Sequence, residues 1–432
     1  MKSKNITMKR FLFVLCLVGL AVACGPREPV VEASDGIEDN LYRFGVNTNP
    51  YEYFNVAETP VPAGYKPFYI SHYGRHGSRS NWGDGYGPVV EAYVKAQEAG
   101  VLSEEGERAL RQVQTIFALH DDKNGRLTPR GAREHRQIAH RMYEKYKSVF
   151  RSESRRVRAV SSTSPRCLVS MAAFTGELLS LDPKLDVGWD TGEQFMKYLS
   201  SGDPKDLTMA AYQILSEENA SYEPDTVYFA QRVFSDEQAG REAVGGSIEN
   251  LMSGTISFAV ISGAFDQDQT LIDLFNVEDL KHYARIICMD LFLRQCNSAE
   301  FGDVRMAVPE VDALVEDFIE KADEAIAGGD CVADLRFGHD WHLLAFCARI
   351  GVKGIGERLT KDEAKDWPGW LYTPFAGNFQ MVFYRNKAGN VLVKCFINER
   401  ETTLLGLPDG PYYAWEDVKQ AFRAPCCEPS SK

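Results

Sequence analysis

A histidine between two arginines is the arrangement in this chain that points most directly to chemistry: Arg75-His76-Gly77-Ser78-Arg79. Each guanidinium group presents five N–H donors in a planar fork that matches the oxygens of a phosphoryl group. An imidazole between two such cations is a poor metal ligand, because the positive charges repel a metal ion. The same imidazole can attack a phosphorus atom whose charge the arginines neutralise. The pentapeptide therefore predicts a phosphoryl-transfer site with His76 as nucleophile.

Two later segments add residues suited to an anion. Ser164 is a good helix N-cap and Pro165 a good first helical residue, which places Arg166 in the first turn of a helix. Backbone N–H groups and the helix dipole favour an anion at that position too. His339-Asp340 precedes another apolar helical stretch, 341–350, and the Gly351 that follows suits a left-handed helix end.

The same order of elements surrounds all three segments. A strand-like apolar run (68–74, 157–162 or 333–338) leads into a few polar residues and then into a pattern of helical period. Strands that alternate with helices predict an α/β sheet with helices on both faces. Ligands bind at the carboxyl ends of the strands in such sheets, so we expect the three polar segments to meet there.

Together these segments resemble the histidine acid phosphatase branch of the histidine phosphatase superfamily. The resemblance extends from about residue 65 to 420 and includes two further motifs. The family's LTxxG segment is matched by Leu127-Thr128-Pro129-Arg130-Gly131 with Glu134, His135 and Arg141, and its central arginine segment by Ser162-Thr163-Ser164-Pro165-Arg166. Phe337-Gly338-His339 and Phe396-Ile397-Asn398-Glu399-Arg400 are most similar to multiple inositol-polyphosphate phosphatases and related phytases.

The resemblance implies a fold and a role for each residue. The fold would be a three-layer α/β/α core of the phosphoglycerate-mutase type with an inserted, mainly helical cap. His76 would form a phosphohistidine, and Asp340 would protonate the leaving alcohol and then deprotonate water. The phosphate would be held by Arg75, Arg79, Arg166 and His339. The resemblance implies no metal or other cofactor.

Two departures from the family pattern leave the substrate open. Asn81 stands where the first motif usually has a proline, and His339-Asp340-Trp341 replaces the His-Ala-Glu often found in inositol-polyphosphate phosphatases. We expect a phosphomonoesterase that favours inositol polyphosphates such as phytate. The alternative enzyme is a broad-specificity acid phosphatase acting on sugar phosphates or nucleotides. The alternative outside enzymes is an envelope lipoprotein that only binds phosphorylated ligands, although binding requires neither a nucleophile nor a proton donor.

A basic stretch offers further cations for a substrate with several phosphates. Residues 121–158 hold 12 lysines and arginines and five acids, an excess of seven in a chain of net charge −13. A solvated helix face is the ordinary explanation for such a run. Arg126 and Arg130 precede the helix of the LTxxG segment, so both are candidates for binding substrate.

The first 24 residues predict export. Four basic residues among the first ten precede the apolar stretch 11–23, which is too short to span a bilayer comfortably. The small residues before Cys24 resemble a bacterial lipoprotein signal in which Cys24 is lipidated, and an ordinary secretory peptide is the alternative. We therefore expect a cell-envelope protein, in the periplasm or at the outer membrane, that meets the membrane only through this lipid anchor. Export permits disulfides, but the eight cysteines beyond Cys24 fix no pairing and match no zinc pattern.

Length and charge set the remaining expectations. The net charge of −13 argues against general binding of nucleic acid. We expect a signal peptide over 1–24, a tether over 25–45, an α/β core over 46–182 and 331–425, and a mainly helical cap over 183–330. Near the C-terminus, strand-like runs at 379–385 and 391–398 flank a polar turn and predict a hairpin.

Overall fold

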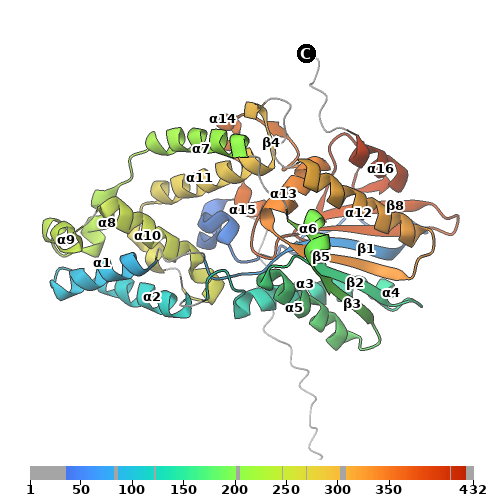
Figure 1. Cartoon of the computed structure of the whole chain (residues 1–432), viewed down its shortest axis with the longest axis horizontal. Coiled ribbons are helices and arrows are strands. Elements are labelled where there is room, and N and C mark those ends of the chain that lie inside the picture. The colour runs from blue at the N-terminus through green and yellow to red at the C-terminus, as the bar shows by residue number, and fades with distance from the viewer. Residues whose placement is uncertain are drawn as a thin grey trace, which may run out of the picture.

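An α/β region and a helical region lie side by side in the computed structural model (Figure 1). The structure describes residues 36–81, 86–120, 123–200, 205–245, 247–268, 270–301, 308–408 and 410–424. The predicted signal segment, its Cys24 and the first part of the predicted tether lie outside these ranges.

The α/β region is built on an eight-stranded sheet of order β10-β8-β7-β1-β5-β2-β3, with β9 paired to β8. β1, β5, β2 and β3 are parallel neighbours, and β7, β8, β9 and β10 pair antiparallel. β5 is buried along nearly its whole length, as expected for a parallel strand covered on both faces. The strands are β1 (Lys66–Arg75), β2 (Arg156–Ser161), β3 (Asp186–Thr191), β5 (Cys331–Gly338), β7 (Asn378–Arg385), β8 (Val391–Ile397), β9 (Arg400–Thr402) and β10 (Tyr412–Ala414).

Helices cover both faces of this sheet, which confirms the predicted α/β fold. On one face α4 packs against β1 and β5, and α5 against β2 and β5, with α3 beside α5. On the other face α12 and α13 pack against β1, and α6 packs against β2 and β5. These helices and the one near β8 and β10 are α3 (Pro129–Lys145), α4 (Lys147–Phe150), α5 (Pro165–Leu181), α6 (Glu193–Leu199), α12 (Val308–Ile326), α13 (Asp340–Arg349) and α16 (Trp415–Arg423).

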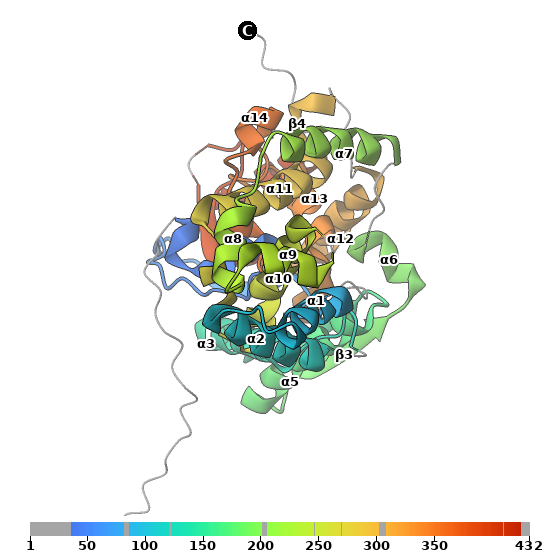
Figure 2. The same cartoon turned by 90° about the vertical axis from the view of Figure 1, so that its left-hand side faces the viewer.

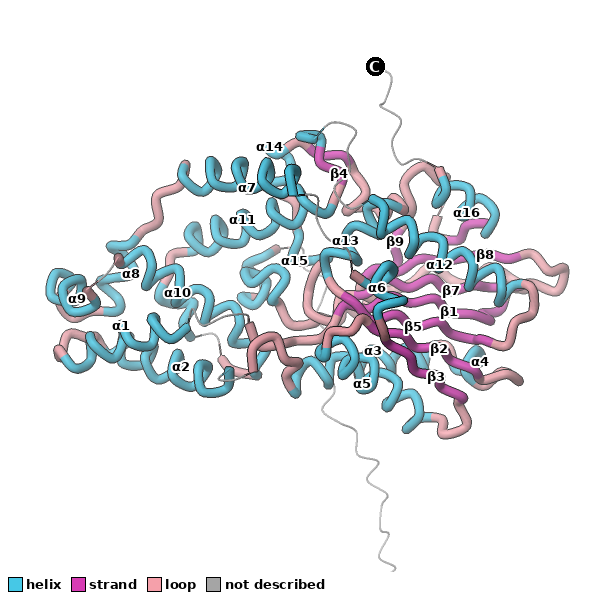
Figure 3. Tube along the Cα trace, in the orientation of Figure 1, coloured by secondary structure: helices cyan, strands magenta, loops and turns pink. Residues whose placement is uncertain are grey.

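The helical region faces the viewer in Figure 2 and lies opposite the strands in Figure 3. Its helices are α1 (Tyr86–Glu98), α2 (Glu104–His120), α7 (Lys205–Ala220), α8 (Thr226–Val233), α9 (Glu237–Val244), α10 (Ile248–Ile261) and α11 (Val277–Gln295). The stretch Ile248–Phe265 is long and apolar enough to cross a membrane by composition, but 67% of it is buried inside the fold, as in a core helix.

Short elements complete the described chain. η2 (Leu41–Thr48) lies between the two regions. It packs against α10, α11 and α15, and its Asn47 also contacts Asp340, which follows the carboxyl end of β5. The others are η1 (Ile37–Asp39), η3 (Ser262–Phe265), η4 (Thr270–Leu274), η5 (Ala299–Phe301), α14 (Lys361–Ala364), α15 (Gly369–Tyr372), and the paired strands β4 (Asn297–Ser298) and β6 (Arg358–Leu359).

The boundaries of the helical region differ from those expected from the sequence. α1 and α2 fall in the expected core range 46–182, yet they pack against α8, α9 and α10, where their apolar faces are covered. β3, α6 and α12 fall in the expected cap range 183–330, yet they belong to the sheet and its covering layer. β3 is an edge strand with mostly exposed side chains, so its sequence lacks the apolar alternation that marks a strand.

Most of the other predicted elements are confirmed. The three apolar runs are β1, β2 and β5, and the runs near the C-terminus are the antiparallel hairpin of β7 and β8. α5 begins at Pro165, although the side chain of Ser164 makes no capping hydrogen bond. Gly351 follows α13 with a φ of 74°, the left-handed conformation expected there.

Candidate active site

The carboxyl ends of β1, β5 and β2 bring the three polar segments to one place. Arg75 is in register with Gly338 across β1 and β5, and Ser161 with Phe337 across β2 and β5. The loops continue this pairing, because the His76 N–H donates to the Gly338 carbonyl at 3.0 Å and the Ser162 N–H to the Phe337 carbonyl at 3.0 Å. The pairing of the strands and loops therefore brings the residues at 75–79, 162–166 and 339–340 together.

His76 is held as a neutral imidazole with one nitrogen available. Its Nδ1 lies 2.9 Å from the Gly77 carbonyl, which can only accept, so Nδ1 carries the proton and Nε2 carries the lone pair. The residue is 1% exposed. Burial lowers its pKa well below the usual value, and the charges of Arg75 and Arg79 lower it further. The Nε2 atom is thus ready to act as a nucleophile in acidic as well as neutral solution.

Three guanidinium groups crowd around this histidine. Arg75 donates from Nη1 to the Thr373 carbonyl at 2.7 Å, and its Cζ lies 4.8 Å above the centre of the Phe375 ring. Arg79 lies over the same ring at 5.9 Å. Burial, followed by repulsion from Arg75, lowers the pKa of Arg79 to about 9. This repulsion between buried cations would be relieved by a bound anion, so the site is prepared for one.

His339 connects the loop that follows β5 with the loop that follows β2. Its Nδ1 lies 3.2 Å from Nη2 of Arg166 and its Nε2 lies 3.2 Å from Oγ of Ser162. The Trp341 ring stacks on the imidazole with 4.2 Å between centres and 7° between planes. Burial and then the charge of Arg166 lower the pKa of His339 to about 3, so the ring is neutral.

Asp340 is the acid of the site. Its Oδ2 lies 3.0 Å from Nη2 of Arg75 and accepts a hydrogen bond from Nδ2 of Asn47 at 3.1 Å. Burial disfavours the charged form, but Arg75 and then Arg79 outweigh burial and hold the pKa of this carboxyl below its usual value. Asp340 is therefore ionised at neutral pH, and a bound phosphate dianion would offset the arginines and favour its protonation.

The LTxxG segment supports the loop that carries His76. Thr128 donates from its backbone N–H (2.9 Å) and its hydroxyl (3.1 Å) to the Ser78 carbonyl, and Glu134 accepts from the N–H and hydroxyl of Ser78. A Cβ on Gly77 would lie 2.4 Å from the carbonyl oxygen of Gly131, so the loop can approach α3 only because residue 77 is glycine. These contacts fix the backbone that follows His76.

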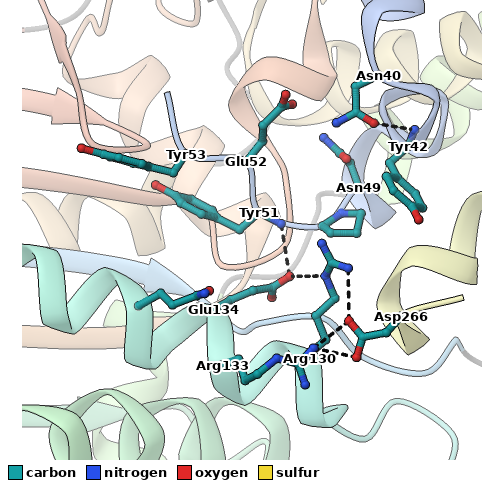
Figure 4. Close-up of a pocket in the computed structure, with 12 residues that line it drawn as sticks. Asn40, Tyr42, Asn49, Tyr51, Glu52, Tyr53, Arg130, Arg133, Glu134 and Asp266 are labelled. Atoms are coloured by element: carbon teal, nitrogen blue, oxygen red, sulfur yellow. Dashed lines mark hydrogen bonds and ion pairs between the residues drawn. The ribbon is translucent and has the colours of Figure 1, made fainter. Parts of the chain in front are cut away.

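The two predicted substrate-binding arginines lie outside this cluster. Arg126 is exposed, and its carbonyl accepts from the Ser80 N–H at 2.9 Å, which places it beside the loop after Arg79. Arg130 is turned toward Asp266 and Glu134, at 3.2 and 3.5 Å, in a cavity of about 350 Å³ (Figure 4). In that view the Glu134 carboxylate lies between Arg130 and the backbone N–H of Tyr51. The same carboxylate accepts the hydrogen bonds from Ser78.

Several residues of the site carried no signal in the sequence. Asn47 belongs to no motif and reaches Asp340 from 293 positions away. Phe375 and Thr373 lie on a loop without polar clusters, and Trp341 was visible only as a departure from the family pattern. Among the described residues, no group of three or more His, Cys, Asp or Glu side chains could hold a metal ion.

Comparisons with known proteins identify the family and support the fold. The family model of the histidine phosphatase superfamily (branch 2) matches residues 74–398. The structure is similar to the multiple inositol polyphosphate phosphatase of Bifidobacterium longum in complex with inositol hexasulfate, with 16% identity, a TM-score of 0.69, and coverage of 90% of this chain and 99% of that one. It also resembles the phytase of D. castellii, with 14% identity, a TM-score of 0.61, and coverage of 90% of this chain and 87% of that one. The apo form of the Hafnia alvei phytase is similar with 12% identity, a TM-score of 0.51, and coverage of 86% of this chain and 100% of that one. A search of curated proteins found no match.

Proposed function

Because the chain belongs to branch 2 of the histidine phosphatase superfamily and is a histidine-type phosphatase, we propose that it hydrolyses phosphate monoesters through a phosphohistidine on Nε2 of His76. The observation that carries this proposal is the juxtaposition of a neutral, singly hydrogen-bonded imidazole with three arginines and one carboxyl group. A site that only bound phosphate would need the arginines but neither of the other two groups.

The residues divide the reaction into two steps. In the first, Nε2 of His76 forms a bond to phosphorus as the ester P–O bond breaks, and Asp340 gives its proton to the departing alcohol oxygen. In the second, Asp340 takes a proton from water, whose oxygen bonds to phosphorus as the P–N bond breaks. Arg75, Arg79, Arg166 and His339 hold the non-bridging oxygens and offset the charge on them.

The favoured substrate class is an inositol polyphosphate such as phytate. Support comes from the similarity to the structures of an inositol polyphosphate phosphatase and of phytases, and from the exposed Arg126 beside the loop of Arg79. The pairing of Arg130 and Arg133 with Asp266 favours the second candidate, a broad-specificity phosphatase, because those two cations are already neutralised.

We also propose that the enzyme is exported and anchored in the cell envelope through a lipid on Cys24. The positive start, the apolar stretch 11–23 and the small residues before Cys24 support this. Membrane fractionation of cells carrying the native chain and a Cys24→Ser variant tests it, and a variant that stays with the membrane fraction as the native chain does would contradict it.

A phosphate-release panel tests the activity. The native protein is incubated with phytate, glucose phosphate and an aryl phosphate from acid to neutral pH, beside His76→Ala. We expect His76→Ala to lose at least about 10⁴-fold in kcat/KM, and the native protein to trap acid-labile, base-stable phosphate. Unchanged release by His76→Ala would exclude His76 as nucleophile, whereas similar efficiency on phytate and glucose phosphate would favour the broad-specificity enzyme.

A further inference from the structure

We infer that Asn47 is the positioning residue of the proton donor: its side-chain amide fixes Oδ2 of Asp340 and leaves Oδ1 to carry the proton to the leaving alcohol. This inference rests on the proposed function, because it assigns a part in the same reaction. It concerns a residue of the N-terminal segment, outside every motif that indicated the site.

Both contacts of the Asp340 carboxylate fall on the same oxygen, Oδ2. Oδ2 accepts the 3.1 Å hydrogen bond from Nδ2 of Asn47, while Nη2 of Arg75 lies 3.0 Å away as a close charge. That nitrogen of Arg75 lacks the alignment of a hydrogen bond, so the amide of Asn47 supplies the directional contact. Oδ1 has no partner among the described residues, although the carboxylate as a whole is buried.

The segment that carries Asn47 is held in a costly conformation. Val46, the preceding residue, has φ 49° and ψ −99°, a backbone geometry that a β-branched residue rarely adopts. Such strain is costly and persists only where the surroundings enforce it. Strained residues of this kind cluster at functional sites, and here the strain turns the chain toward Asp340 immediately before residue 47.

Buried contacts on both sides enforce this conformation. Arg43 is fully buried and pairs with Glu52 at 2.8 Å, and it donates to the Gly36 carbonyl at 2.5 Å. Beyond the strained residue, the Thr48 hydroxyl donates to the Gly45 carbonyl at 2.9 Å and the Phe375 N–H donates to the Asn49 carbonyl at 2.7 Å. The last contact ties the segment to the ring beneath Arg75 and Arg79.

An amide suits this position because it donates to Oδ2 in both protonation states of the acid. When Oδ1 is protonated, Oδ2 is a carbonyl oxygen and still accepts from Asn47. Arg75, Arg79, Arg166 and His339 also face the carboxyl group, and the charged arginines favour only its ionised form. Asn47 therefore keeps the acid oriented through the whole cycle without opposing its protonation.

Two variants of Asn47 test the inference through kcat/KM, which reports the first phosphoryl transfer alone. Asn47→Ala should lower kcat/KM for glucose phosphate by about 10- to 100-fold, because an alkoxide leaves poorly without a positioned acid. The loss for an aryl phosphate, whose leaving group needs little protonation, should stay below about 3-fold. Asn47→Asp, which keeps the shape of the side chain, places a second carboxyl group beside Oδ2, so the two share a proton and the acid form persists to higher pH.

In Asn47→Asp, the pH at which kcat/KM for glucose phosphate begins to fall should be higher than in the native protein by at least about one pH unit. Asn276→Ala is the matched control, since it removes an N-cap of α11 and touches no residue of the site. Equal losses on both esters, or an unmoved pH profile in Asn47→Asp, would overturn the inference. Failure of the proposed function has a different result, because the native protein would then release phosphate as His76→Ala does.

Discussion

The arginines at the carboxyl ends of the strands and those of the stretch 121–158 differ in the source of their counter-charges. Arg75, Arg79 and Arg166 are all influenced by the same nearby carboxylate, Asp340, so three guanidinium groups share one acid of the site. Most arginines of the basic stretch pair with acids from other elements, and Arg130, which shares Asp266 with Arg133, also pairs with Glu134. These pairs are Arg130 and Arg133 with Asp266, Arg141 with Glu399, Arg155 with Asp182, Arg156 with Asp330, and Arg158 with Asp334 and Asp317.

The difference separates a binding site from a scaffold. Where cations outnumber acids in a buried place, the missing negative charge belongs to the ligand, and the protein bears a cost in stability until the ligand arrives. Where each cation has its acid, the pair is satisfied and contributes to the fold alone. The same side chain therefore predicts catalysis in one region and stability in the other.

Arg166→Ala and Arg158→Ala should separate these two roles most clearly. Arg166→Ala should lower kcat/KM by about 10²- to 10³-fold on every ester, because it removes a donor to the transferring phosphoryl group. Arg158→Ala should leave kcat/KM nearly unchanged but lower the free energy of unfolding by about 2–4 kcal/mol, since it leaves the buried Asp334 without its cation. Steady-state kinetics and denaturant unfolding of both variants give the comparison. Similar losses of stability and activity in both would contradict it.

The pH dependence of kcat/KM should show that the arginines of the site act on the ionisation of Asp340. Asp340 donates a proton only when it is protonated, and its arginines keep its pKa below the usual value in the free enzyme. The ratio of kcat/KM for an alkyl ester to that for an aryl ester should therefore fall by about tenfold per unit as pH rises above that pKa. His76 is neutral far into the acid range, so its protonation should not reverse this trend at mildly acid pH.

A ratio that rises between mildly acid and neutral pH would mean that a group other than Asp340 protonates the alcohol. Asp340→Asn is the control, because its ratio should be low and nearly independent of pH. The two esters differ in the second ionisation of their phosphate, so each kcat/KM is expressed per phosphate dianion before the ratio is taken.

The sequence predicted the site because its residues follow strands whose order in space is constrained. Parallel strands that alternate with helices place their carboxyl ends at one edge, so Arg75, Arg166 and His339 could be brought together before any coordinate was known. Short motifs of this kind encode both the chemistry and the backbone that presents it. This explains why β1, β2 and β5 and their loops were predicted correctly.

The sequence could not show which cations were already neutralised. Asp266 lies 133 positions from Arg133, and Glu399 lies 258 positions from Arg141. A local excess of seven positive charges therefore disappears in three dimensions, because acids from distant elements fold onto it. Asn47 was missed for the same reason: a contact across 293 positions leaves no spacing to recognise.

Arg126 is the residue of the basic stretch that should depart from this pattern. It is exposed, has no ion pair in the described part of the chain, and its backbone is bonded to Ser80 beside the nucleophile loop. Arg126→Ala should raise KM for phytate by about 3- to 10-fold, since a second phosphate would lose a cation, and leave KM for an aryl phosphate unchanged. Arg136→Ala is the matched control, because Arg136 is also an exposed arginine of the basic stretch and lies on α3. A KM for phytate that is equal in both variants would remove Arg126 from the substrate site.

Asp266 offers the smallest but most direct test, because its removal takes the acid from Arg133 and leaves Arg130 with Glu134 alone. Its carboxylate lies 3.2 Å from Arg130 and 2.6 Å from Arg133, and it is 46% exposed, so water screens both pairs and their loss should hardly affect stability. Asp266→Ala should lower KM for phytate by about twofold, and less at high salt, while KM for an aryl phosphate stays constant. Asp330→Ala frees Arg156 from a similarly exposed pair on the far end of β2 and should change neither value. If Asp266→Ala also leaves both KM values unchanged, the ion pairs are not what keeps these arginines from the substrate. Their distance from the bound ester would then be the reason.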